Sequence, residues 1–315
     1  MQNGAVTLSE TKRHPDFGAG FWRLADPKIS LASFASMFLG ACLAAGSRPL
    51  DWGWLLLTVA GVFAIEVAKN ASGEIVDFDS GTDLGVTPEH RSPFSGGKRV
   101  LVDGVLTRRQ TLGIAVAGYA AGLAVAVWIA VARALWLLAL AGASVAIAYF
   151  YHASPLRLSY RGWGEAAVAV TYGPLLCAGV YLVQTRPVPF EVLWLGTAVG
   201  LLIGAFLWIN EFPDAEADRA AGKRTLVVRL GVRRAVHGYC VIVAAAYLML
   251  ILTPAVTPSS PAVWLGGVAI PCSAFACKRL AAAPEETARI VPAQAASLFA
   301  FVLFALGTGL GALLA

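Results

Sequence analysis

Nine long apolar segments dominate this sequence and limit the folds that it can adopt. A helix needs about 20 mostly apolar residues to cross a bilayer, because the hydrocarbon layer is roughly 30 Å thick and each residue adds about 1.5 Å. Only 14% of the residues are charged, against about 25% in soluble domains. The sequence therefore predicts an all-α membrane protein with nine transmembrane helices. The predicted helices are 29–47, 52–71, 110–131, 133–152, 163–183, 190–210, 235–253, 262–280 and 290–314.

The basic residues predict how these helices lie in the membrane. Loops rich in Lys and Arg stay on the cytoplasmic side. With the N-terminus in the cytoplasm, all of the 24 lysines and arginines except Arg48, Arg133 and Arg186 fall on that side. We therefore expect residues 1–28 to form a cytoplasmic tail with an interfacial segment, and residues 29–315 to form the nine-helix domain. Basic charges confined to short loops offer no continuous groove for a nucleic acid, so none is expected as a partner.

Two acid-rich stretches follow the second and sixth apolar segments, at what the predicted topology makes the same side of the membrane. They read "KNASGEIVDFDSGTD" (69–83) and "NEFPDAEADRAAGKRT" (210–225). Their polar residues recur at helical spacing, which places them along one face of each helix, and Asp83 follows on the loop after Ser80 and Gly81. The first cluster contains Asn70, Glu74, Asp77 and Asp83, and the second contains Asn210, Asp214 and Asp218.

Carboxylates held this close repel one another unless a cation neutralises them. Mg²⁺ takes oxygen ligands and is typically held by one or two carboxylates together with substrate phosphates. Two opposed clusters could hold two such ions around a diphosphate and stabilise the charge of a leaving group. The plainer alternative is that these acids are solvated helix ends.

Basic, glycine-rich loops follow both acidic clusters. They read "HRSPFSGGKRV" (90–100) and "GKRTLVVRLG" (222–231). Backbone N–H groups and cationic side chains in such loops can cradle a phosphate. The alternative is that these residues only anchor the loops on the cytoplasmic side.

The paired motifs resemble those of the UbiA superfamily of membrane prenyltransferases. "NEFPDAEADRAAGKRTLVVRLG" resembles the N-x-x-x-D-x-x-x-D motif with its trailing G-K-R-T-L, and "GEIVDFDSGTD" resembles the N-D-x-x-D motif with its further Asp. "YHASPLRLSYRGWGE" (151–165) and "RLADPKISLAS" (23–33) resemble the branch that prenylates naphthoate and related quinone precursors. The sequence departs from the family at Gly73 and Glu74, where Asn and Asp are usual. Asn70, one turn earlier, is a candidate replacement for the missing amide.

The resemblance implies a nine-helix bundle around a central cavity in the cytoplasmic (inner) membrane, with its site facing the cytoplasm. It implies Mg²⁺-dependent transfer of a prenyl group from a prenyl diphosphate to an aromatic, quinone-precursor-like acceptor. Asp77, Asp83, Asp214 and Asp218 are the predicted catalytic residues. The predicted ligands of two Mg²⁺ ions are Asn70, Glu74, Asp77, Asp83, Asn210, Asp214 and Asp218. The candidates for binding the diphosphate are Arg91, Lys98, Arg157, Lys223 and Arg224. The candidate aromatic faces for the allylic cation are Phe63, Tyr149 and Phe206.

Some assignments stay open at this stage. A cyclase of the same superfamily would carry nearly the same motifs but need no acceptor. An ion-coupled transporter is a third reading, although transporters place such groups near the bilayer midplane. His152 is a candidate general base or a structural residue, and it is not included among the predicted site residues. Glu66, inside the second apolar segment, is a functional candidate or the ion-pair partner of Lys69.

Overall fold

The computed structural model describes residues 16–314, and helices and loops make up all of that range. The main helices are α1 (Phe17–Ala25), α2 (Pro27–Ala45), α3 (Trp52–Asp79), α5 (Arg108–Ala132), α6 (Trp136–Phe150), α7 (Gly164–Val170), α8 (Leu176–Gln184), α9 (Phe190–Ala220), α11 (Val232–Val256), α12 (Ile270–Ala282) and α13 (Thr287–Leu313). The short elements are α4 (Thr82–Gly85), η1 (Pro88–His90), η2 (Leu158–Tyr160), η3 (Thr171–Leu175), α10 (Leu226–Leu230) and η4 (Pro261–Ala269).

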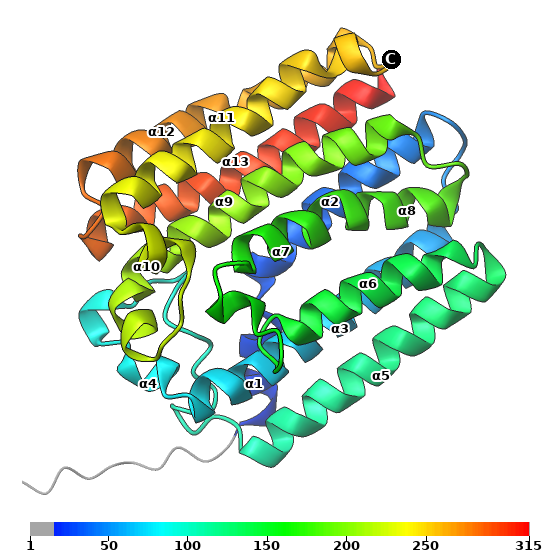
Figure 1. The fold of residues 1–315 in the computed structure, drawn as a ribbon. Coiled ribbons are helices and arrows are strands. Elements are labelled where there is room, and N and C mark those ends of the chain that lie inside the picture. The colour runs from blue at the N-terminus through cyan, green and yellow to red at the C-terminus, as the bar shows by residue number, and fades with distance from the viewer. Residues whose placement is uncertain (1–15, 315) are drawn as a thin grey trace, which may run out of the picture.

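The long helices run roughly antiparallel to their neighbours in the chain, so the connections gather at two ends of the bundle (Figure 1). One end carries the connections 80–107, 151–163 and 221–231. The opposite end carries the short turns 46–51, 133–135 and 185–189. Both acidic motifs and both basic loops therefore lie at the same end of the bundle, as the sequence predicts.

Eight helices in the described range are long and apolar enough to cross a membrane by their length and composition. Each of the nine predicted segments coincides with helical structure. The segment predicted at 133–152 is a 15-residue apolar helix, α6, which spans only about 22 Å at 1.5 Å per residue. The protein is a multi-pass membrane protein, whereas the count of nine crossings and the cytoplasmic N-terminus stay predictions. Residues 1–15 of the predicted tail lie outside the described residues, and Phe17–Ala25 of the same tail form α1. The place of this segment at the membrane interface stays a prediction.

The helix predicted at 163–183 is interrupted. Pro174 lies in the π-helical turn η3, which separates α7 from α8. This turn packs against α9 at very short range, since a Cβ on Gly173 would lie 2.5 Å from the carbonyl oxygen of Gly196. Helix α7 is equally close, since a Cβ on Gly200 would lie 2.2 Å from the carbonyl oxygen of Ala169. Small residues let membrane helices approach in this way. The close contact fixes α7, and the loop before it, against α9.

The two acid-bearing helices extend beyond the apolar segments. Helix α9 continues through Pro213 to Ala220 without a break, which keeps Asn210, Asp214 and Asp218 on one helix. Helix α3 ends at Asp79, and Gly81 follows with a φ of 80°. The sequence places Asp83 on a loop, but the structure places it in the one-turn helix α4. The positive φ of Gly81 turns the chain so that α4 can form there.

Candidate active site

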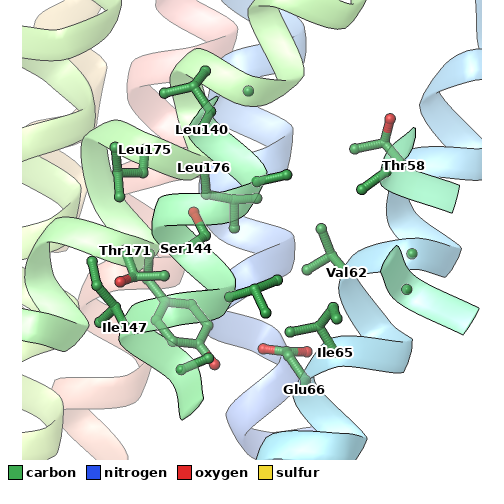
Figure 2. Close-up of a pocket in the computed structure, with 18 of the residues that line it drawn as sticks. Thr58, Val62, Ile65, Glu66, Leu140, Ser144, Ile147, Thr171, Leu175 and Leu176 are labelled. Carbon is green, nitrogen blue, oxygen red and sulfur yellow. The ribbon is translucent and has the colours of Figure 1, made fainter. Parts of the chain in front are cut away.

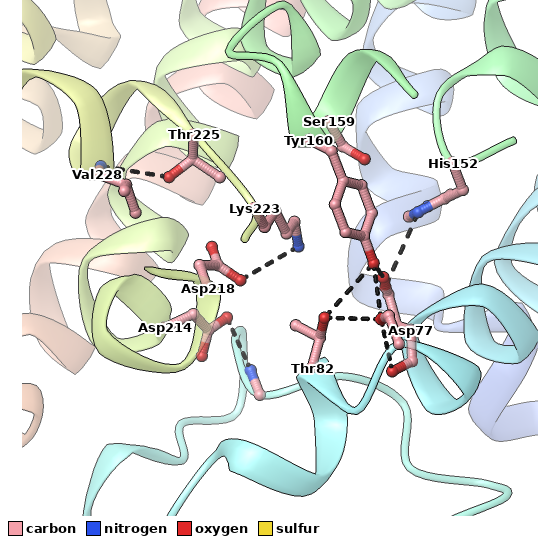
Figure 3. Close-up of polar contacts among 12 residues, drawn as sticks. Asp77, Thr82, His152, Ser159, Tyr160, Asp214, Asp218, Lys223, Thr225 and Val228 are labelled. Carbon is pink, nitrogen blue, oxygen red and sulfur yellow. Dashed lines mark hydrogen bonds and ion pairs between the residues drawn. The ribbon is translucent and has the colours of Figure 1, made fainter. Parts of the chain in front are cut away.

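The two acidic motifs meet on opposite sides of a glycine pair. The Gly96 N–H donates to Asp214 Oδ2 over 3.1 Å. The Asp83 carboxylate lies against Gly97, where a Cβ would be 2.3 Å from Asp83 Oδ1. The basic loop 90–100 thus joins a carboxylate of the first motif to one of the second. Figure 3 shows the second-motif carboxylates and Asp77 facing a common space.

Asp77 is held by the loop that connects α6 to α7. The Tyr160 hydroxyl donates to Asp77 Oδ1 at 2.8 Å, and His152 Nδ1 lies 3.8 Å from Asp77 Oδ2. The guanidinium of Arg157 lies over the Tyr160 ring, 3.8 Å from its centroid. The loop therefore places a hydroxyl, an imidazole and a cation around one carboxylate of the first motif.

Lys223 lies between the two motifs (Figure 3). Its Nζ is 3.4 Å from Asp218 Oδ1 and 5.8 Å from the centroid of the Tyr160 ring. Burial lowers the pKa of Lys223, but the neighbouring Asp218 and Asp77 carboxylates outweigh it and raise the pKa well above its usual range. The side chain is therefore a fixed positive charge at the centre of the acidic site.

The donor set fits a hard cation such as Mg²⁺. Asn210 Oδ1 and Asp214 Oδ1 are buried and have no hydrogen-bond partner, and such groups are costly in a buried site. Burial, followed by the charges of Asp77 and Glu74, raises the pKa of Asp83 to about 8. In residues 16–314, no three Asp, Glu, His or Cys side chains converge into a closed metal cage. Mg²⁺ retains waters and takes phosphate oxygens as ligands, so one or two protein carboxylates can be enough to hold it.

Three of the predicted site residues make other contacts. Asn70 Nδ2 donates to the carbonyl oxygen of Leu24 at 2.7 Å. Glu74 Oε1 accepts from the Leu101 N–H at 3.0 Å, and Lys98 pairs with Asp26. The first two contacts tie α1 and the loop near residue 100 to α3, and the third ties that loop to the α1–α2 junction. They give these three residues an architectural role, and their direct contact with a metal or diphosphate stays a prediction.

The remaining two cationic candidates lie at the rim. Arg91 is exposed, and its Nη2 lies 3.4 Å from the carbonyl oxygen of Val86. Arg224 is also exposed, while its backbone N–H donates to the carbonyl oxygen of Tyr160 at 3.0 Å. Of the five predicted cations, Lys223 pairs with Asp218 of the second motif, and Arg157 lies over the ring of Tyr160, which donates to Asp77.

The sequence reasoning missed Glu165. This side chain is 4% exposed, and its Oε1 accepts from the Leu226 N–H at 2.7 Å. The contact fixes the start of α10 and with it the preceding loop that carries Lys223. A charged residue directly after Gly164, at the start of an apolar segment, was the available signal, because ionisable groups at membrane helices are seldom incidental.

An apolar cavity of about 190 Å³ lies between α3, α5, α6 and the α7–α8 segment (Figure 2). Glu66, Lys69 and Tyr151 line its polar end, and Tyr151 directly precedes His152 of the acidic site. The cavity lining drawn from residues 16–314 contains Tyr151 and Tyr172 but none of the predicted aromatic residues. Those three lie elsewhere: Tyr149 is 50% exposed, Phe206 is buried against Phe94 and Phe301, and Phe63 packs beside α1.

Gly97→Ala is expected to abolish most of the turnover. The matched control is Gly104→Ala. Both glycines have a positive φ, 74° and 66°, so alanine costs about 1–3 kcal/mol of backbone strain at each. Only Gly97 approaches a carboxylate, and a Cβ on Gly104 would meet nothing within 4 Å. Thermal unfolding and turnover of both variants would be measured in detergent. Equal activity in the two variants would contradict the contact between Gly97 and Asp83.

Known proteins resemble this chain over most of its length. The model of the UbiA prenyltransferase family matches residues 33–291. The chain is 28% identical over 247 residues to a 1,4-dihydroxy-2-naphthoate octaprenyltransferase of Bacillus subtilis, covering 76% of each chain. It is 28% identical to a 2-carboxy-1,4-naphthoquinone phytyltransferase of Synechocystis, covering 71% of this chain and 70% of the relative. A UbiA homologue from Archaeoglobus fulgidus bound to GPP and Mg²⁺ superposes with a TM-score of 0.65 at 15% identity, covering 92% of this chain and 99% of the other.

Proposed function

Because the chain belongs to the UbiA prenyltransferase family, we propose that it transfers a prenyl group from a prenyl diphosphate to an aromatic acceptor of the hydroxynaphthoate class. The observation that carries this proposal is the meeting of two acidic motifs around Gly96, Gly97 and Lys223, next to an apolar cavity. The acidic motifs offer ligands for a cation-bound diphosphate, and the cavity offers space for a hydrocarbon chain.

Two further facts support the substrate class. The relatives from Bacillus subtilis and Synechocystis are named for the prenylation of naphthoate and naphthoquinone compounds. The Archaeoglobus fulgidus homologue was solved with GPP and Mg²⁺. We carry these substrates over to this chain as a proposal, with the site facing the cytoplasm.

Residues of both motifs would bind the cation. Asp77 and Asp83 would hold Mg²⁺ from the first motif, and Asn210, Asp214 and Asp218 would hold it from the second. When bound, Mg²⁺ supplies positive charge that stabilises the leaving diphosphate. Lys223 and Arg157 add cationic donors for the phosphate oxygens.

The apolar cavity would then serve the hydrocarbon part of the reaction. Its lining excludes water from the electron-poor carbon that forms when the C–O bond breaks. The ring faces of Tyr151 and Tyr172 could stabilise positive charge there. Loss of a proton from the acceptor ring completes the substitution.

Purified protein with radiolabelled geranylgeranyl or farnesyl diphosphate tests the proposal. Acceptors would include dihydroxynaphthoate, 4-hydroxybenzoate, homogentisate and glycerol phosphates, each with Mg²⁺ or with EDTA. We expect diphosphate release that needs both Mg²⁺ and dihydroxynaphthoate. Release without an acceptor would identify a cyclase instead, and no release under any condition would contradict prenyl transfer.

A further inference from the structure

Gly73 leaves a space beside Asp77 that another part of the chain fills. Residues 73 and 77 are one turn apart on α3, so a side chain at 73 would lie on the same face as Asp77. A Cβ added to Gly73 would lie 2.6 Å from His152 Nε2 and 2.7 Å from its Cδ2. The imidazole of His152 therefore occupies the volume that a side chain at position 73 would take.

The same ring faces the carboxylate of Asp77. His152 Nδ1 is buried without a hydrogen-bond partner and lies 3.8 Å from Asp77 Oδ2. The other oxygen of Asp77 accepts from the Tyr160 hydroxyl. Ring packing holds the imidazole in place, because Tyr151 meets it edge-on with the centroids 4.7 Å apart. Two groups from one loop thus face the two oxygens of one carboxylate.

We propose that His152 stands in for the side chain that Gly73 lacks and positions Asp77 for the cation required by the proposed function, on which this inference rests. In the tautomer that carries its hydrogen on Nδ1, His152 can donate to Asp77 Oδ2 once the separation of 3.8 Å closes to hydrogen-bond length. With Tyr160 on Oδ1 and His152 on Oδ2, the carboxylate has one preferred orientation, and each oxygen keeps lone pairs for a cation. His152 is thus a positioning residue that acts through Asp77.

The first test separates polarity from bulk at position 152. His152→Gln keeps an N–H donor, whereas His152→Leu fills the space over Gly73 without one. The readout is the Mg²⁺ concentration that half-maximally raises the thermal stability of the full chain in detergent with inorganic diphosphate. Loss of a group that orients a metal ligand typically weakens metal affinity about 10–100-fold. We expect His152→Leu to shift the midpoint by that amount and His152→Gln to shift it much less. Equal midpoints for both variants and wild type would overturn the proposal.

The second test introduces a polar side chain at position 73 of α3. Gly73→Asn alone would push the His152 ring away from Asp77 and weaken Mg²⁺ binding. In Gly73→Asn/His152→Ala the amide occupies the vacated space beside Asp77, so the midpoint should lie closer to wild type than that of either single variant. If the losses in Mg²⁺ affinity of the two single variants simply added in the double variant, His152 would not be taking the place of a side chain at position 73.

Two matched controls accompany these variants. Gly113→Asn repeats the substitution on a membrane helix where a Cβ would meet nothing within 4 Å, and His237→Ala removes an exposed histidine. Neither should change the midpoint. The thermal readout needs no prenyl transfer, so a failure of the proposed reaction would appear only as absent turnover in wild type, while the Mg²⁺ midpoints would still decide the role of His152.

Discussion

Asp214→Asn is expected to lower prenyl-transfer turnover at least about a hundredfold, which is the usual scale for the loss of one preorganised electrostatic group. Asp214 Oδ2 accepts from the Gly96 N–H, and its Oδ1 is buried without a partner. The substitution keeps the shape of the side chain but removes the charge that would bind a cation. Burying a neutral amide also avoids the repulsion from Asp218, so the fold should survive.

The matched control for this variant is Glu216→Gln. Glu216 lies two residues away on α9 but is exposed, so it faces away from the site. Turnover at several Mg²⁺ concentrations and thermal unfolding of both variants would be compared. Wild-type turnover in Asp214→Asn, or an equal loss in both variants, would remove Asp214 from the proposed site.

Lys223→Met is expected to lower kcat/KM for the prenyl diphosphate about a hundredfold. Lys223 is the cation that lies between the two motifs, 3.4 Å from Asp218. Methionine matches the length of the lysine stem without the charge, so the packing is largely kept. The substitution also leaves Asp218 without its partner, and breaking one half of a buried ion pair is destabilising. We therefore expect lower thermal stability without Mg²⁺ and partial recovery when Mg²⁺ is added.

The control for this variant is Lys278→Met, at an exposed position on α12. It loses the same charge at a distance from the acids and should keep wild-type kinetics. If Lys223→Met retained wild-type kcat/KM, the ammonium would have only a structural role in neutralising the acids.

The acidic motifs could be located from the sequence because helical spacing survives folding. Asn210, Asp214 and Asp218 share one helix in the sequence and in the structure, since α9 runs on through Pro213. The positions of the apolar segments were likewise predictable, because the hydrocarbon thickness sets their length. The shortness of α6 was not, since hydropathy does not report where a helix ends within an apolar run.

The contacts that complete the site depend on tertiary packing, which spacing alone does not determine. Nothing near Glu74 in the sequence indicates that its carboxylate accepts from the Leu101 N–H. The residues next to His152 in the sequence do not indicate that its ring fills the space over Gly73. The helix is interrupted at Gly173 and Pro174, where Gly173 has non-helical dihedral angles and packs against the backbone of α9. Such long-range contacts turned two predicted ligands, Asn70 and Glu74, toward α1 and the loop near residue 100.

The most direct test of the account is Mn²⁺ binding measured by electron paramagnetic resonance, because carboxylate sites for Mg²⁺ also accept Mn²⁺. The full-length protein in detergent would be titrated with Mn²⁺ in the presence of an unreactive prenyl diphosphate analogue. The account predicts bound Mn²⁺ that is weakened by Asp77→Asn and also by Asp214→Asn, since both motifs contribute ligands. Binding that neither substitution changes would contradict the claim that the two motifs hold the cation together.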